Sequence, residues 1–126
     1  MKRHRLLVVD DDPATLASLR DVLVCAGFEV DTATTGRDAL AKLLDGPVPS
    51  AIVLDARMPE MDGDEFASVA RAYLRFATVP ILLLTAWDTR IGVESHVNVV
   101  MRKPFRIDEL VASVEALIAT SPTAPR

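Results

Sequence analysis

Short apolar runs are separated by segments of a different periodicity along the chain. Four of these runs, at 6–9, 51–54, 81–84 and 97–101, are short and bounded by turn-forming residues, and the first three are uninterrupted. Uninterrupted runs of this length are typical of parallel strands that are covered on both faces. The segment 28–33 (FEVDTA) alternates between apolar and polar residues instead, which predicts a half-buried edge strand. The pattern therefore predicts five strands.

Amphipathic segments lie between the predicted strands. Residues 14–26, 36–45, 64–76 and 107–119 each place apolar side chains on one face of a helix, and the last of these has the most continuous stripe. Strands that alternate with helices are the signature of an α/β doubly wound fold. We therefore predict a five-stranded parallel sheet in the order 2-1-3-4-5, with helices on both faces.

The connection between the last two strands is unusually short. Only residues 86–96 are available for it, and Gly92 lies at the centre of that segment. A crossover between parallel strands normally takes a dozen or more residues, and a central glycine weakens a helix by up to about 1 kcal/mol relative to alanine. The fourth helix is therefore predicted to be short or irregular.

Composition narrows the possible functions. A chain of 126 residues with half of them hydrophobic fits one domain with a real core, which we place at 1–119, with 120–126 as a flexible tail or linker stub. A net charge of −4 argues against a basic nucleic-acid footprint. Cys25 is the single cysteine, so no internal disulfide forms. The N-terminal apolar run is too short for a signal peptide, and we expect no membrane contact and a cytoplasmic location.

Polar residues stand where the predicted strands end. Asp10 and Asp11 follow the first strand, Asp55 ends the third, Thr85 ends the fourth and Lys103 follows the fifth. The carboxyl ends of parallel strands share one rim, where open α/β sheets bind ligands. With the first and third strands adjacent, the three carboxylates should converge, with Thr85 and Lys103 beside them.

Three converging carboxylates need a cation to offset their repulsion. Hard oxygen ligands at a partly open site suit Mg²⁺, which retains waters and accepts phosphate oxygens. A lysine and a hydroxyl beside that cation favour a phosphoryl group, and a carboxylate such as Asp55 can act as the nucleophile that accepts it. Taken singly, these residues also allow simpler interpretations: Asp55 as a strand-end turn residue, Thr85 as a satisfied hydroxyl and Lys103 as a solvated surface lysine. Nearby, Asp12–Pro13 is typical of a helix start, Asp62–Gly63 of a turn, and Met58 and Met61 of packing residues.

Taken together, VVDDD, VLDARMPEMDG, LLTA and KPF resemble the response-regulator receiver domains of two-component signalling, over about residues 4–119. The resemblance implies that Asp10 and Asp11 hold Mg²⁺, that Asp55 is phosphoacceptor and third carboxylate ligand, and that the backbone carbonyl of Arg57 is a further ligand. Thr85 would be the switch hydroxyl. Lys103 would contact the phosphoryl group, and the bond from it to Pro104 is often cis in this family.

The resemblance also implies the partners. The phosphodonor would be a histidine kinase or phosphotransfer protein, and the phosphorylated domain would bind a downstream protein of unknown identity, without contacting nucleic acid directly. Such a domain is a signalling module rather than an enzyme, with only self-catalysed phosphoryl transfer and slow autodephosphorylation. This sequence departs from the family in having Val100 where an aromatic residue is usual, and in carrying the large residues Arg57 and Trp87 two positions after Asp55 and Thr85.

Two other functions remain open at this stage. The chain is also compatible with the receiver part of a longer regulator that has a DNA-binding or enzymatic output. A Mg²⁺-dependent phosphatase of haloacid-dehalogenase type is less compatible, because its motif needs a second aspartate where Arg57 stands. A flavodoxin-like cofactor binder lacks support, because no phosphate-binding loop follows the first strand.

Overall fold

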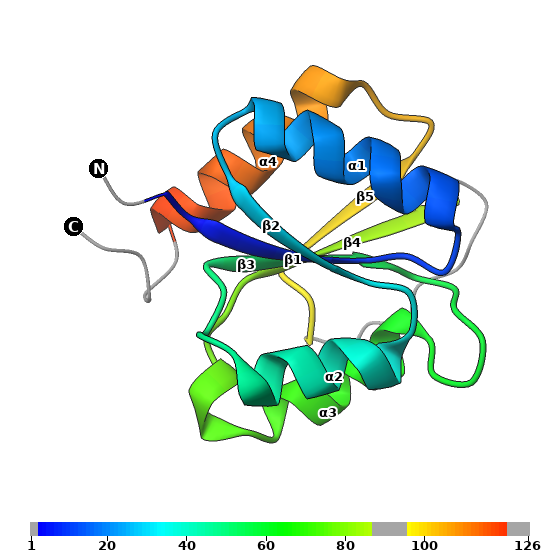
Figure 1. Cartoon of the computed structure of the whole chain (residues 1–126), viewed down its shortest axis with the longest axis vertical. Coiled ribbons are helices and arrows are strands. Elements are labelled where there is room, and N and C mark those ends of the chain that lie inside the picture. The colour runs from blue at the N-terminus through cyan, green and yellow to red at the C-terminus, as the bar shows by residue number, and fades with distance from the viewer. Residues whose placement is uncertain (1–2, 87–95, 121–126) are drawn as a thin grey trace.

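The computed structural model describes residues 3–86 and 96–120. Five parallel strands form one sheet in the order β2-β1-β3-β4-β5, as predicted. Helices lie above and below this sheet, so that the sheet and the helices form three layers (Figure 1). The strands are β1 (Arg5–Val9), β2 (Glu29–Ala33), β3 (Ala51–Asp55), β4 (Ile81–Ala86) and β5 (Val99–Lys103). The helices are α1 (Pro13–Cys25), α2 (Gly36–Asp45), α3 (Gly63–Arg71) and α4 (Ile107–Thr120), with a 3₁₀ turn, η1 (Leu74–Phe76).

Two apolar cores lie on the two faces of the sheet. Helices α2 and α3 pack on one face and α1 and α4 on the other (Figure 1). Successive side chains of a strand point to opposite faces, so β1, β3 and β4 supply both cores and are buried along almost their whole length. This is why their sequences are uninterrupted apolar runs.

The helix starts follow from capping side chains. Asp12 accepts a hydrogen bond from the backbone N–H of Ala14 at the start of α1, with Pro13 as the first helical residue, as predicted. Asp62 accepts from the backbone N–H of Glu65 at 2.9 Å. The expectation that Asp62–Gly63 is only a turn is therefore wrong, because Asp62 is the N-cap of α3.

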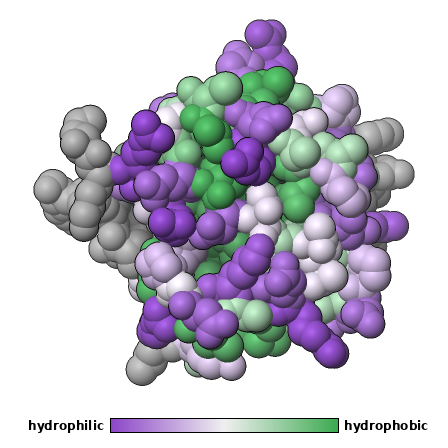
Figure 2. Space-filling view, viewed as in Figure 1, coloured by the Kyte–Doolittle hydropathy of each residue, from purple (hydrophilic) through white to green (hydrophobic). Residues whose placement is uncertain are grey.

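Charged side chains line the edge strand β2. Arg5 of β1 lies 3.1 Å from a carboxylate oxygen of Glu29 and 3.0 Å from one of Asp31. Charges on an edge strand disfavour pairing with another chain. Hydrophilic residues are spread over the whole face that contains β2, with smaller apolar areas between them (Figure 2).

Two expectations about element boundaries and burial are wrong. The run 97–101 is expected to form a strand covered on both faces, but β5 spans Val99–Lys103 and leaves Val100 38% exposed. The position of β5 at the sheet edge, with a neighbour on one side only, agrees with the predicted order and explains the exposure. The helix expected at 64–76 ends at Arg71 and is followed by η1. The predicted short fourth helix and Trp87 fall in 87–95, outside the described residues. None of the described helices combines the length and apolar character needed to cross a membrane.

Candidate functional site

Three carboxylates converge at the carboxyl ends of β1 and β3. These strands are neighbours with Val9 opposite Leu54, so the residues that follow them reach the same point of the rim. One carboxylate oxygen from each of Asp10, Asp11 and Asp55 lies within 4.8 Å of the others. The sequence-based expectation that these three side chains meet is therefore confirmed.

Asp10 is the most buried of the three, with 2% of its surface exposed. Its Oδ1 accepts a hydrogen bond from the backbone N–H of Asp12 at 2.9 Å, whereas its Oδ2 has no hydrogen-bond partner among the described residues. Burial raises the pKa of this carboxyl group above its usual range, and the neighbouring charge of Asp11 raises it further. An oxygen that is buried, unpaired and next to two other carboxylates is suited to ligate a cation.

Asp55 is 9% exposed and ends β3. Burial is the largest cause that raises its pKa, and the charge of Asp10 is the next. Lys103 and the backbone N–H of Arg57 oppose that rise. The Nζ atom of Lys103 lies 3.7 Å from Oδ1 of Asp55. Asp55 thus lies between acidic neighbours and a lysine. In this position a cation can neutralise its charge while the carboxylate reacts.

Thr85 and Lys103 come from the next two strands. Thr85 is 1% exposed, and its hydroxyl has no hydrogen-bond partner among the described residues. Thr85 of β4 lies opposite Arg102 of β5, and Lys103 is the residue that follows Arg102. The peptide bond between Lys103 and Pro104 is cis, as the resemblance implied. The structure thus brings together the side chains of Asp10, Asp11, Asp55, Thr85 and Lys103 at one rim, whereas the side chain of Arg57 is exposed.

The sequence did not reveal how the loop after β3 is held against the site. Gly63 is buried, and a Cβ atom at this position would lie 2.6 Å from the backbone carbonyl oxygen of Asp55. The backbone N–H of Gly63 also donates to the carbonyl of Ala56 at 3.0 Å. Glycine is therefore required at residue 63, where the start of α3 closes against the end of β3. The sequence did contain one indication of this helix start, because Asp62 is a preferred N-cap residue and precedes an amphipathic segment.

The acidic cluster fits a divalent metal ion. Carboxylate oxygens are the ligands that hard cations prefer, and the unpaired Oδ2 of Asp10 leaves one of them available. Without a cation, three like charges at this separation repel one another. The donor set and its geometry thus form an acidic pocket suited to a metal ion.

Comparison with known proteins identifies the family. Residues 6–115 match the family model of the response regulator receiver domain, so this chain belongs to that family. The transcriptional regulatory protein PrrA of Mycobacterium tuberculosis is 43% identical over 118 residues, which cover 90% of this chain and 49% of PrrA. The response regulator MprA of Mycolicibacterium vanbaalenii is 41% identical, with 90% of this chain and 50% of MprA covered. This chain thus spans about half the length of the curated relatives it matches.

Solved structures agree with this assignment. The chemotaxis protein CheY4 of Vibrio cholerae has a TM-score of 0.81 and 30% identity, covering 92% of this chain and 99% of CheY4. The receiver domain of the Francisella response regulator 1452 has a TM-score of 0.81 and 28% identity, covering 93% and 98% of the two chains. The chain is thus a receiver domain of two-component signalling.

Proposed function

We propose that Asp55 accepts the phosphoryl group of this receiver domain in a Mg²⁺-dependent reaction. The convergence of Asp10, Asp11 and Asp55 within 4.8 Å, with Lys103 at 3.7 Å from Asp55, is the observation that carries the proposal. Asp55 has the position of a nucleophile, since its carboxylate lies beside the acidic pair and forms an ion pair with Lys103. Asp10 and Asp11 would hold the metal, with the carboxylate of Asp55 and the backbone carbonyl of Arg57 as further ligands.

The reaction transfers a phosphoryl group from the imidazole of a phosphohistidine, or from a small acyl phosphate, to Asp55. A carboxylate oxygen of Asp55 forms the new bond to phosphorus, and the bond from phosphorus to the leaving group breaks, with the electron pair remaining on the leaving group. The metal supplies charge neutralisation for the phosphoryl oxygens. Lys103 neutralises part of the remaining charge, since its ammonium group already lies beside Asp55.

Thr85 provides the switch in this proposal. Its hydroxyl is buried and has no partner in the described part of the chain, so it is available to donate to a phosphoryl oxygen once Asp55 is modified. A buried hydroxyl that gains a hydrogen bond stabilises the phosphorylated state relative to the unmodified state. The phosphorylated domain would then bind a downstream protein partner in the cytoplasm. The chain would act as a signalling module whose only catalysis is its own phosphorylation and slow dephosphorylation.

Intact-protein mass spectrometry after incubation with acetyl phosphate tests the proposal. We expect one added phosphoryl group in MgCl₂ and none in EDTA. The D55N variant should gain none, whereas D64N, which changes an exposed aspartate in the first turn of α3, should react like the parent chain. An adduct that forms without metal, or one that D55N still acquires, would contradict the assignment of Asp55.

A second candidate function is supported by the length of the relatives. PrrA is named a transcriptional regulatory protein, and this chain covers only 49% of it. We infer that the domain could equally serve as the receiver part of a longer regulator with a DNA-binding output. The reading frame downstream of the codon for Arg126 distinguishes the two, since continued coding sequence supports the longer regulator.

A further inference from the structure

The loop of residues 56–62 is the part of the proposed metal site with the least backbone support. It joins β3 to α3 and carries Arg57. Within the described residues, its backbone hydrogen bonds to other elements lie near its ends, from Ala56 N–H to the Leu84 carbonyl at 2.8 Å and from Gly63 N–H to the Ala56 carbonyl at 3.0 Å. The position of the central part of the loop must therefore depend on its side chains.

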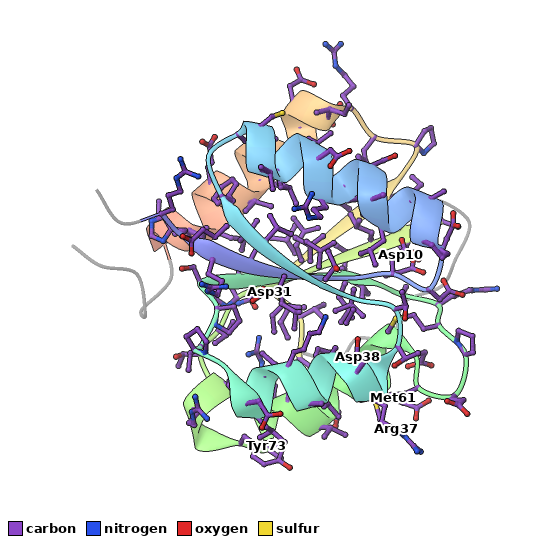
Figure 3. All side chains as sticks on the ribbon, viewed as in Figure 1. Asp10, Asp31, Arg37, Asp38, Met61 and Tyr73 are labelled. Carbon is purple, nitrogen blue, oxygen red and sulfur yellow. The ribbon has the colours of Figure 1, made fainter. Side chains whose placement is uncertain are left out.

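Two methionines attach this loop to the core. Met58 is 8% exposed and belongs to the core between the sheet and helices α2 and α3. Met61 is partly buried and packs against the same core. Figure 3 shows Met61 at the N-terminal end of α2, near Arg37 and Asp38. The loop is thus attached to the core by Met58 and to the first turn of α2 by Met61.

The contact with α2 depends on Gly36. A Cβ atom at residue 36 would lie 2.9 Å from Sδ, 3.1 Å from Cγ and 3.2 Å from Cβ of Met61. The first of these distances is shorter than a carbon and a sulfur atom tolerate without a bond between them. The terminal part of a methionine rotates away at little cost, but its Cβ is fixed to the backbone. A side chain at residue 36 therefore requires the backbones of the loop and of α2 to move apart by a few tenths of an ångström, in addition to moving the thioether.

We propose that Gly36 is a positioning residue for the metal site. By allowing Met61 to lie directly on the first turn of α2, it sets where the loop runs and hence where the backbone carbonyl of Arg57 is presented to the cation. The inference rests on the proposed function, because it assigns a role to Gly36 only if the acidic cluster binds Mg²⁺. It assigns to α2 a part in metal binding, although α2 contributes no ligand.

The neighbouring contacts make the loop sensitive to a shift at Met61. Its backbone N–H donates to the carbonyl of Pro59 at 2.7 Å, so that a movement is passed to the preceding residues. On the other side, Asp62 is fixed as the N-cap of α3, and Gly63 closes against the carbonyl oxygen of Asp55. Because the end of the loop at α3 is fixed, a displacement of Met61 moves the part of the loop that contains Arg57.

Isothermal titration with MgCl₂ of the parent chain and of G36A, M61G and G36A/M61G tests the proposal. We expect G36A to weaken Mg²⁺ affinity about tenfold, the lower end of the range for groups that support metal ligands indirectly. Because glycine at residue 61 removes all three contacted atoms, Cβ included, adding G36A to M61G should change the affinity less than twofold. G46A is the matched control, since Gly46 caps the other end of α2, and it should bind Mg²⁺ like the parent. Thermal melts in EDTA verify that each variant is folded.

The outcomes separate this inference from the proposed function. If the parent chain binds no Mg²⁺, the proposed function fails and the role of Gly36 fails with it. If the parent binds Mg²⁺ and G36A binds it equally well, only the role of Gly36 is refuted. The same holds if G36A weakens binding equally in the parent and the M61G background, because the effect would then not pass through the side chain of Met61.

Discussion

Replacing Asp10 by asparagine should stabilise the domain without metal and remove its stabilisation by Mg²⁺. Asparagine keeps an oxygen to accept the hydrogen bond from Asp12 N–H, and it replaces the unpaired Oδ2 by an amide that donates to the neighbouring carboxylates. The variant thus loses one of three like charges with little change in shape. The order of stability between D10N and the parent should therefore reverse on adding metal.

The size of the effect follows from the geometry of the cluster. Two unit charges 4.8 Å apart repel by about 3.5 kcal/mol at an effective dielectric of about 20. Exposure of Asp11 to solvent and the attraction of Lys103 offset part of this, which leaves about 2 kcal/mol in favour of D10N in EDTA. For a domain of this size that corresponds to a rise in Tm of about 6–10 °C. The parent chain should gain about 2.7 kcal/mol at a Mg²⁺ concentration of 100 times its Kd, and D10N much less.

The pH dependence of stability tests the repulsion argument independently. Burial raises the pKa of both Asp10 and Asp55, so above the usual aspartate value of about 3.9 the folded chain retains protons that the unfolded chain has lost. The raised pKa values therefore stabilise the folded chain fully at a pH below about 3.9. This contribution to the free energy of unfolding is lost as the pH rises through the raised pKa values. The advantage of D10N over the parent should be greatest near pH 7 and shrink toward pH 4.

Urea unfolding in EDTA and in MgCl₂, at several pH values, measures all three effects. D12N is the control, because Asp12 belongs to the same acidic run but caps α1, and asparagine caps a helix as well as aspartate does. A parent chain that is as stable as D10N in EDTA would refute the repulsion argument. Equal Mg²⁺ stabilisation of both chains would refute the role of Asp10 as a ligand.

Three further predictions follow from single residues. T85V should raise the unfolding free energy of the unmodified domain by about 1–2 kcal/mol, measured in urea, because a buried hydroxyl without a partner is removed; no gain would indicate that the hydroxyl is already satisfied. E60G should stabilise the domain by about 1 kcal/mol in the same assay, because Glu60 has a φ of 70°, a left-handed conformation that is strained for glutamate and not for glycine; a loss would contradict this. R57A should release the phosphoryl group of Asp55 faster, by up to about tenfold, or about 1.4 kcal/mol in the barrier, if the bulk of Arg57 restricts the attacking water; unchanged or slower decay, measured by mass spectrometry after removal of the donor, would refute the steric explanation.

The sequence alone determined the fold class, the sheet order and the residues that meet at the rim. Uninterrupted apolar runs identify strands buried on both faces, and the carboxyl ends of parallel strands lie on one side whatever the packing details. Asp10, Asp11, Asp55, Thr85 and Lys103 could therefore be placed together from their positions after each strand. A motif set spread over almost the whole chain then indicated the family.

Only the tertiary structure decided which residues support that rim. The apolar run before Lys103 is typical of a strand covered on both faces, but Val100 of β5 is 38% exposed, and a local pattern does not show how much of each face the rest of the domain covers. Gly36 and Gly63 look like ordinary glycines in sequence. Their necessity comes from Met61 and from the carbonyl of Asp55, which lie 25 and 8 residues away along the chain and come within van der Waals distance only in the folded domain. Contacts between residues distant in sequence depend on packing, so periodicity cannot reveal them.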